Sequence, residues 1–437
     1  MTQGPLGRLE GNARILALFK LANVGLAMLW GFAVTFVFVR LLPIAEFRAF
    51  LILVALANFT VSADFGFSGI LYARLRKYRL AEGAGAPDGF RPRDMAMLFA
   101  FMAAVVLLGA LVIGGGLATG HIGTRRPGLF IAFYLLTSAN IFAIFAKRAL
   151  AALDHNLLWE LIDAARRVMS LALLMAALAG LPILLSVCAQ LLLAAMALLL
   201  GLGVVHRATG MRARDWLPGA GMFGVVRRDY MRDMGATMAL TLSDVAAYNA
   251  PYFGMAAVTH DPRPLLVFDF VFKISRALTA MIRALVEAGL PRLTNAWHDG
   301  RMDRARQIVT RLERLSLAAA AGLGLFLVAL GSMLSNLLFA GKAALTPAEL
   351  ALLALLLLGL AWLCVSTYVH NGFGRFGALL PPSLAFLALS LLSVPCAAWL
   401  AQATGQPLAL CFTGLYAATH VVIAFVHARM LRGLVRA

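Results

Sequence analysis

Charged residues are scarce in this sequence of 437 residues: only 13% are Asp, Glu, Lys or Arg, whereas 62% are hydrophobic. Soluble domains are about half apolar and about a quarter charged, so the composition excludes an ordinary soluble protein. A membrane-spanning helix needs about 20 mostly apolar residues. Such segments recur near residues 15–39, 49–71, 95–119, 128–148, 160–180, 183–205, 234–258, 265–289, 315–340, 348–371, 383–402 and 406–428. The sequence therefore predicts an all-α, polytopic membrane protein with about twelve spans.

Cysteine is also rare. The four residues, Cys188, Cys364, Cys396 and Cys411, all fall inside predicted spans. Their spacing fits neither a disulfide framework nor a zinc site, so they are expected to be packing residues. We expect no metal, no cofactor and no catalytic residue, and hence a protein that is not an enzyme.

Acidic residues are few as well: 20 Asp and Glu face 38 Lys and Arg, which gives a formal net charge of +18. Most of the basic residues fall in alternate loops, and loops rich in Lys and Arg stay in the cytoplasm. Both termini are therefore predicted to be cytoplasmic. Because the basic residues separate spans instead of building one soluble face, they predict no nucleic-acid partner.

The chain is predicted to form two halves. Residues 1–205 and 236–437 would each be a lobe of six helices, joined by a basic, Pro- and Gly-containing cytoplasmic linker at 206–235. A weak internal echo agrees, since DFGFSGILYARL (64–75) and VEAGLPRL (286–293) both place an acid, then glycine, then a basic exit at the end of a span. Parallel repeats of this kind occur in transporters, although chance similarity explains the echo equally well.

The eighth predicted span carries five ionisable groups at helical spacing: Asp269, Lys273, Arg276, Arg283 and Glu287. Steps of three and four residues put them on one helix face. A charge at membrane depth costs at least about 2.5–3.5 kcal/mol, so such groups normally face water, a partner or a substrate. The stripe predicts a hydrated cavity. The alternative is internal pairing of Asp269 with Lys273 and of Arg283 with Glu287, both four residues apart, which leaves Arg276 over.

Other spans carry fainter polar faces. The substrate-binding candidates are Lys20, Asn23, Lys273, Arg276 and Arg283, and the acids that would couple transport to H⁺ or Na⁺ are Asp64, Asp244, Asp269 and Glu287. For Asn23 the competing interpretation is an interhelical hydrogen bond, and for Asp64 it is a bond that holds the bend at 66–69. Two amphipathic basic segments, 155–167 and 298–314, suit either helices at the inner membrane surface or ordinary topology-setting loops.

Two stretches resemble a known family. RLLPIAEFRAFLILVALANFTVSADFGFSGILYARL (40–75) resembles the opening of the polysaccharide transporter branch of the MOP superfamily, the Wzx-like O-antigen flippases. LPRLTNAWHDGRMDRARQIVTRLERL (290–315) resembles the second-half signature of the superfamily, although Asp299 and Gly300 reverse the commoner Gly–Asp order.

The resemblance implies two six-helix lobes around a central cavity that opens alternately to either side. It also implies a multi-pass protein of the bacterial inner membrane that flips a polyprenyl-pyrophosphate-linked oligosaccharide to the outer leaflet, for lipopolysaccharide or other surface polysaccharide. Its partners would be membrane lipid and a polysaccharide polymerase or other assembly proteins, and the protein would function as a monomer. The anionic pyrophosphate suits arginine, whose planar fork donates two hydrogen bonds at once.

Three other functions stay open. A cation-coupled multidrug antiporter of the same superfamily shares the fold, but Lys273, Arg276 and Arg283 would repel its usual cationic cargo. A peptidoglycan-precursor flippase is close in chemistry, yet that branch typically has fourteen spans. A membrane glycosyl polymerase, ligase or acyltransferase would need a sizeable outer loop or a His–x4–Asp pair; the loops are short, and the nearest spacing is His155 to Glu160.

Overall fold

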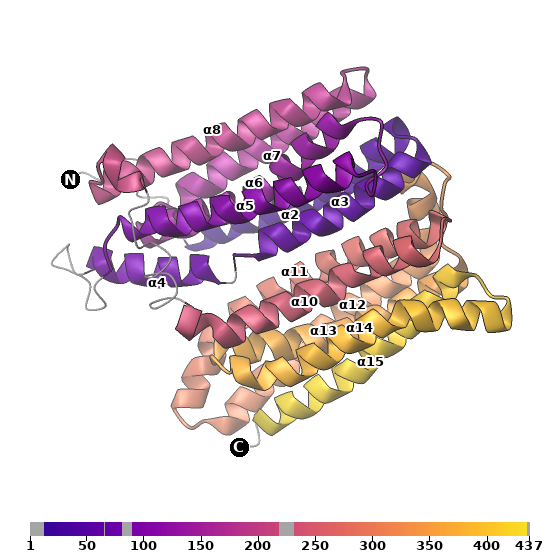
Figure 1. Cartoon of the computed structure of the whole chain (residues 1–437). Coiled ribbons are helices and arrows are strands. Elements are labelled where there is room, and N and C mark those ends of the chain that lie inside the picture. Colours follow the sequence, from indigo (N-terminus) through magenta and orange to yellow (C-terminus); the bar gives the residue numbers. More distant parts are fainter. Residues whose placement is uncertain (1–12, 65, 81–89, 218–230, 435–437) are drawn as a thin grey trace. The chain divides into compact units, whose positions relative to one another are not determined.

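The computed structural model describes residues 13–64, 66–80, 90–217 and 231–434, and all the regular elements within these ranges are helices. The chain divides into two compact units, Met1–Met238 and Ala239–Ala437 (Figure 1). The all-α architecture predicted from the apolar segments is confirmed.

Unit 1 contains seven α-helices and one short 3-10 helix in its described part. They are α2 (Ala13–Leu41), α3 (Ile44–Ser62), α4 (Phe67–Leu80), α5 (Asp94–Ala118), α6 (Pro127–Ala152), α7 (Asn156–Leu178), α8 (Ile183–Thr209) and η1 (Ala213–Trp216). Helix α6 is central, because it packs against α3, α4, α5, α7 and α8, while α2 packs mainly on α7. Buried aromatic rings fill the space between α2, α3 and α6, where Phe38 and Phe50 stack with centroids 4.3 Å apart.

Unit 2 contains most of α10 (Met231–Val258), whose first turns belong to unit 1, and all of the remaining helices: α11 (Arg263–His298), α12 (Met302–Leu338), α13 (Pro347–Gly372), α14 (Phe376–Thr404) and α15 (Leu408–Leu434). Helix α13 packs against α11, α12, α14 and α15. At Gly359 a Cβ atom would lie 3.1 Å from the backbone carbonyl of His420 on α15. Small residues permit such close backbone approach between membrane helices.

Nine candidate membrane spans meet the combined length and apolarity requirement within the described residues, with α3 and α4 counted as one. Helices α7, α10 and α11 are equally long but do not meet the combined requirement, because polar or charged residues are distributed along them. With these three, each unit has six membrane-length segments.

Three segments differ from the predicted boundaries. The second predicted span is interrupted between Ser62 and Phe67, where Gly66 has φ +84°. The predicted linker at 206–235 is partly helical, since α8 continues to Thr209 and α10 begins at Met231. Residues 218–230 of that linker lie outside the described residues. The basic segment 298–314 belongs largely to α12, which continues into the apolar part without a break.

Candidate functional site

The charged stripe of α11 separates into three parts. At its start, Asp269 is fully buried, forms an ion pair with Lys273, and accepts a hydrogen bond of 2.9 Å from the Tyr252 hydroxyl on α10. At its end, Arg283 Nε lies 2.7 Å from Glu287 Oε1, and both side chains are about half exposed. Both pairings that the spacing allowed are confirmed.

Arg276 lies between these pairs and is exposed. Its guanidinium carbon lies 6.0 Å from the centroid of the Phe272 ring. It is also within electrostatic range of Asp244 on α10, which accepts a hydrogen bond from Ser383 on α14. The structure therefore brings together two candidates from different helices. The pairing scheme left Arg276 without a counter-charge, but Asp244 supplies one nearby. An exposed cation near a carboxylate can bind an anionic group. When it does so it no longer neutralises the carboxylate, which can then take up a proton.

The candidates in unit 1 have different surroundings. Lys20 is exposed on α2. Asn23 is buried and its amide nitrogen donates to Glu160 on α7, to the backbone oxygen at 2.8 Å and to Oε2 at 2.6 Å. Asp64 accepts bonds from the backbone nitrogen and the hydroxyl of Ser68 at 3.1 and 2.7 Å. Asn23 thus makes the interhelical bond, and Asp64 holds the bend, as the competing interpretations expected.

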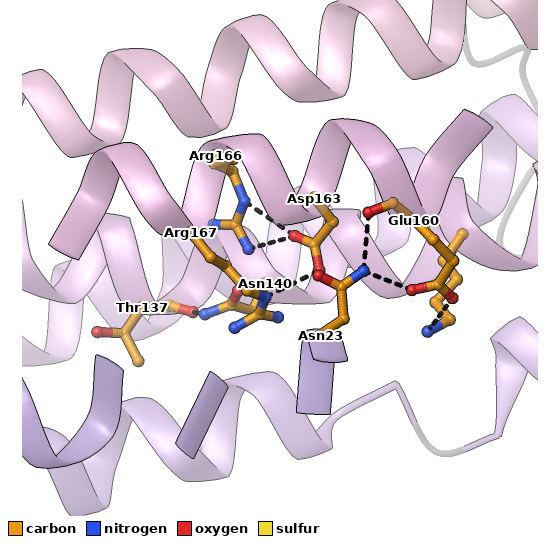
Figure 2. A network of polar contacts seen from close by, with 8 residues as sticks. Asn23, Thr137, Asn140, Glu160, Asp163, Arg166 and Arg167 are labelled. Atoms are coloured by element: carbon orange, nitrogen blue, oxygen red, sulfur yellow. Dashed lines mark hydrogen bonds and ion pairs between the residues drawn. The ribbon is translucent and has the colours of Figure 1, made fainter. Parts of the chain in front are cut away.

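The main polar network of unit 1 is centred on α7, and its α7 residues were not among the predicted site residues (Figure 2). The first acid, Glu160, is 1% exposed and its Oε1 lies 2.9 Å from Nζ of Lys147 on α6. The second, Asp163, is 6% exposed and binds both Arg166 and Arg167. The interpretation of 155–167 as a surface helix or loop is therefore wrong, because the segment forms the first half of α7, a continuous helix packed on α2 and α8.

A sequence signal for this network exists. Glu160, Asp163 and Arg167 follow one another at steps of three and four, as on one helix face. Two acids at that spacing inside a predicted span mark a buried polar face as clearly as the stripe on α11 does. Arg166 and Arg167 concealed it, because adjacent arginines at the end of an apolar run also indicate a loop boundary.

Within the described residues, no three His, Cys, Asp or Glu side chains come together in a way that could hold a metal ion. Both units contain buried charged side chains in helices that are long enough to cross a membrane. Such charge is typical of substrate and ion pathways.

No family model matches the sequence, and no curated protein does. Solved structures do. A crystal structure of MATE in complex with MaL6 aligns over 96% of this chain and 95% of its own, with a TM-score of 0.65 and 13% identity. This chain has a MATE-like transporter fold. An inward-facing multidrug resistance MATE family transporter of the MOP superfamily aligns over 96% and 94% of the two chains, at TM-score 0.65 and 12% identity.

A eukaryotic MATE transporter has the same MATE-like fold, with 96% of this chain and 100% of that chain covered, a TM-score of 0.58 and 14% identity. The structural neighbours are thus transporters of the MOP superfamily, which agrees with the coarser part of the resemblance found in the sequence. The polysaccharide branch is not represented by the MATE structures described.

Proposed function

We propose that this chain is a secondary transporter that exports an amphipathic molecule by alternating access of its two six-helix units. The observation that supports this is the match to MATE transporters over 96% of the chain. The buried charges fit the same function, because coupling requires ionisable groups inside the membrane. We place it in the bacterial inner membrane as a monomer with cytoplasmic termini.

The comparisons favour the multidrug antiporter over the flippase, since one matched structure is described as a multidrug resistance transporter. The flippase of lipid-linked oligosaccharides is the second candidate. Arg276 and Arg283 support it, because both are exposed cations on one helix, and arginine binds pyrophosphate well through its planar fork.

Proteoliposomes that contain the purified protein distinguish the two cargoes. One arm measures export of a cationic dye, and the other measures flipping of a labelled polyprenyl-pyrophosphate oligosaccharide, each with and without an imposed H⁺ or Na⁺ gradient. Gradient-driven dye export with no flipping supports the antiporter, and the reverse supports the flippase. Transport of neither cargo under any gradient would contradict the proposed function.

We expect Arg276→Ala to lower transport of an anionic cargo about tenfold, since a hydrogen bond to a charged group contributes about 1.5–3 kcal/mol. For a cationic dye the same change should leave export unchanged or faster, because a repulsive charge is removed. Initial rates in proteoliposomes measure both. The matched control is Arg301→Ala, which removes another exposed arginine, one that pairs with Asp299 between α11 and α12. Full flipping by Arg276→Ala/Arg283→Ala would exclude these arginines from the cargo site.

Asp244→Asn should abolish the dependence of transport on the gradient while leaving cargo binding in place. The amide keeps a polar group beside Ser383 but cannot exchange a proton or bind Na⁺ as a carboxylate does. Transport rate against imposed gradient, with cargo affinity measured separately, tests this. Asp299→Asn changes an exposed acid outside the bundle and should behave as wild type. Unaltered gradient dependence in Asp244→Asn would exclude Asp244 from coupling.

A further inference from the structure

The first turns of α12 carry three arginines on the side of the helix opposite its packed face. Arg304, Arg311 and Arg314 are exposed, and steps of seven and three residues place them on one side of the helix. The buried residues of the same stretch lie on the other side; they are Ala305, Val309, Leu312 and Ser316. We call the three arginines the basic row.

The acids near the basic row are directed to other cations. Glu313 is within electrostatic range of Arg432, in the last turn of α15, and a carboxylate oxygen of Asp303 lies 3.8 Å from Arg306. Within the part of the chain that the structure describes, none of the three arginines of the row forms an ion pair. Their positive charge can therefore attract an anion from outside the protein.

The face that carries the basic row continues along α12 as an apolar surface. Leu315, Leu325 and Met333 lie on the same side as Arg311 and are 46%, 72% and 62% exposed. Among the nine candidate spans of the described residues, the apolar window of α12 has the smallest buried share, 22%. In a membrane, such a face contacts lipid. Helix α12 therefore presents lipid with one continuous face that is apolar along the span and basic at its start.

Two arginines of the row lie at the depth of lipid head groups. From Leu315 to Leu338 the helix has no charged residue, and at 1.5 Å per residue this part is about 36 Å long, enough to cross hydrocarbon of about 30 Å. Arg314 adjoins this part, and Arg311 lies about 6 Å outside Leu315 along the helix axis. A head-group layer is about 5–8 Å thick. Because residues three apart are neighbours on a helix surface, Arg311 and Arg314 can contact the same head group.

We propose that Arg311 and Arg314 bind the head group of an anionic phospholipid in the leaflet beside the start of α12, while the exposed apolar face of the helix contacts its acyl chains. Arginine forks bind phosphate well, and a lipid with net negative charge attracts basic residues near the membrane surface more strongly than a zwitterionic lipid does. The adjoining apolar face favours a lipid over a soluble anion. This surface goes beyond the proposed transport function, because none of the candidate cargo or coupling residues belongs to it.

The test is a titration of the full-length protein in mild detergent with phosphatidylglycerol or with zwitterionic phosphatidylcholine, followed by native mass spectrometry. We expect wild type to bind phosphatidylglycerol more tightly. Arg311→Gln/Arg314→Gln should weaken that binding about 25-fold, or about fivefold for each arginine, and should leave phosphatidylcholine binding unchanged. The matched control is Arg301→Gln/Arg306→Gln, which removes the same charge from the same end of α12, at arginines that have Asp299 and Asp303 beside them. Its affinity for phosphatidylglycerol should be close to that of wild type.

A second measurement separates lipid binding from a structural role of the two arginines. In phosphatidylcholine nanodiscs, Arg311→Gln/Arg314→Gln should unfold at the same temperature as wild type, because exposed side chains away from the packed face contribute little to stability. Added phosphatidylglycerol should raise the Tm of wild type more than that of this variant, since a ligand stabilises the state that binds it. Arg311→Lys/Arg314→Lys keeps the charge but loses the forks, so its affinity for phosphatidylglycerol should lie between those of wild type and the glutamine variant.

Three results would overturn the proposal. The first is equal affinity of wild type for the two lipids, and the second is an equal loss of phosphatidylglycerol binding in the glutamine variant and in the control. The third is displacement of phosphatidylglycerol by inorganic pyrophosphate at constant ionic strength, which would assign the basic row to a soluble anion. None of these measurements involves transport, so the lipid surface and the proposed function are tested separately.

Discussion

Arg263→Met should lower the free energy of unfolding of this protein by about 3–5 kcal/mol, the cost typical of stranding one partner of a buried ion pair. Both carboxylate oxygens of Glu349 accept hydrogen bonds of 2.9 Å from the Arg263 guanidinium, which joins the start of α11 to the start of α13. The side chain of Glu349 is fully buried, whereas that of Arg263 is 29% exposed. Methionine keeps much of the arginine's volume but leaves the buried carboxylate without its cation.

Thermal unfolding of the purified protein in detergent measures this effect, with an expected fall in Tm of about 10 °C. Glu349→Gln should cost less, because the amide still fits the site and the arginine can turn toward water. The matched control is Arg283→Met, which breaks an ion pair whose members are 53% and 57% exposed. Such exposed pairs contribute about 0–1 kcal/mol. A fall in Tm that is equal for Arg263→Met and Arg283→Met would contradict the argument from burial.

The helices and the pairings within α11 could be predicted from the sequence because they depend on local order. A run of about 20 apolar residues predicts a span whatever its neighbours are. Likewise, Asp269 with Lys273 and Arg283 with Glu287 meet because residues four apart lie on one helix face. Neither inference needs to know which helices pack together.

Contacts between helices could not be predicted in the same way. Asn23 and Glu160 are 137 positions apart, and their hydrogen bond depends on the packing of α2 on α7. The approach of Arg276 to Asp244 depends similarly on how α10 and α11 are rotated about their axes. A helical wheel shows which residues share a face but not which face meets which, so the partner of each candidate was open until the fold was known.

The break between α3 and α4 has a local cause that the apolar pattern conceals. Residues 49–71 are apolar enough to be one span, yet Gly66 adopts a positive φ that only glycine takes readily, and Asp64 bonds to Ser68 across the bend. Hydropathy averages over such a turn. In the sequence, Gly66, Gly69 and Asp64 indicate the turn, and they are the reason for the competing interpretation that Asp64 holds a bend.

Lys147→Met is expected to destabilise unit 1 by about 3–5 kcal/mol, and more than Glu160→Gln does. The ion pair is asymmetric: the Glu160 side chain is 1% exposed, whereas that of Lys147 is 42% exposed. Removal of the lysine leaves a carboxylate in the interior, and Asn23 is then its one close hydrogen-bond donor among the residues that the structure describes. Removal of the acid's charge leaves a lysine that can extend to water along its flexible stem.

A double-mutant cycle gives the decisive measurement, because it isolates the interaction between the two side chains. Lys147→Met/Glu160→Gln should be more stable than Lys147→Met alone, since the buried carboxylate that made the single change costly is gone. Asp94→Asn, at the exposed start of α5, changes a carboxylate to an amide outside the network and should shift Tm little. If the loss of stability in the double variant equals the sum of the losses in the two single variants, Lys147 does not stabilise the charged form of Glu160. Its place in the bundle would then rest on its bonds to Asn23 alone.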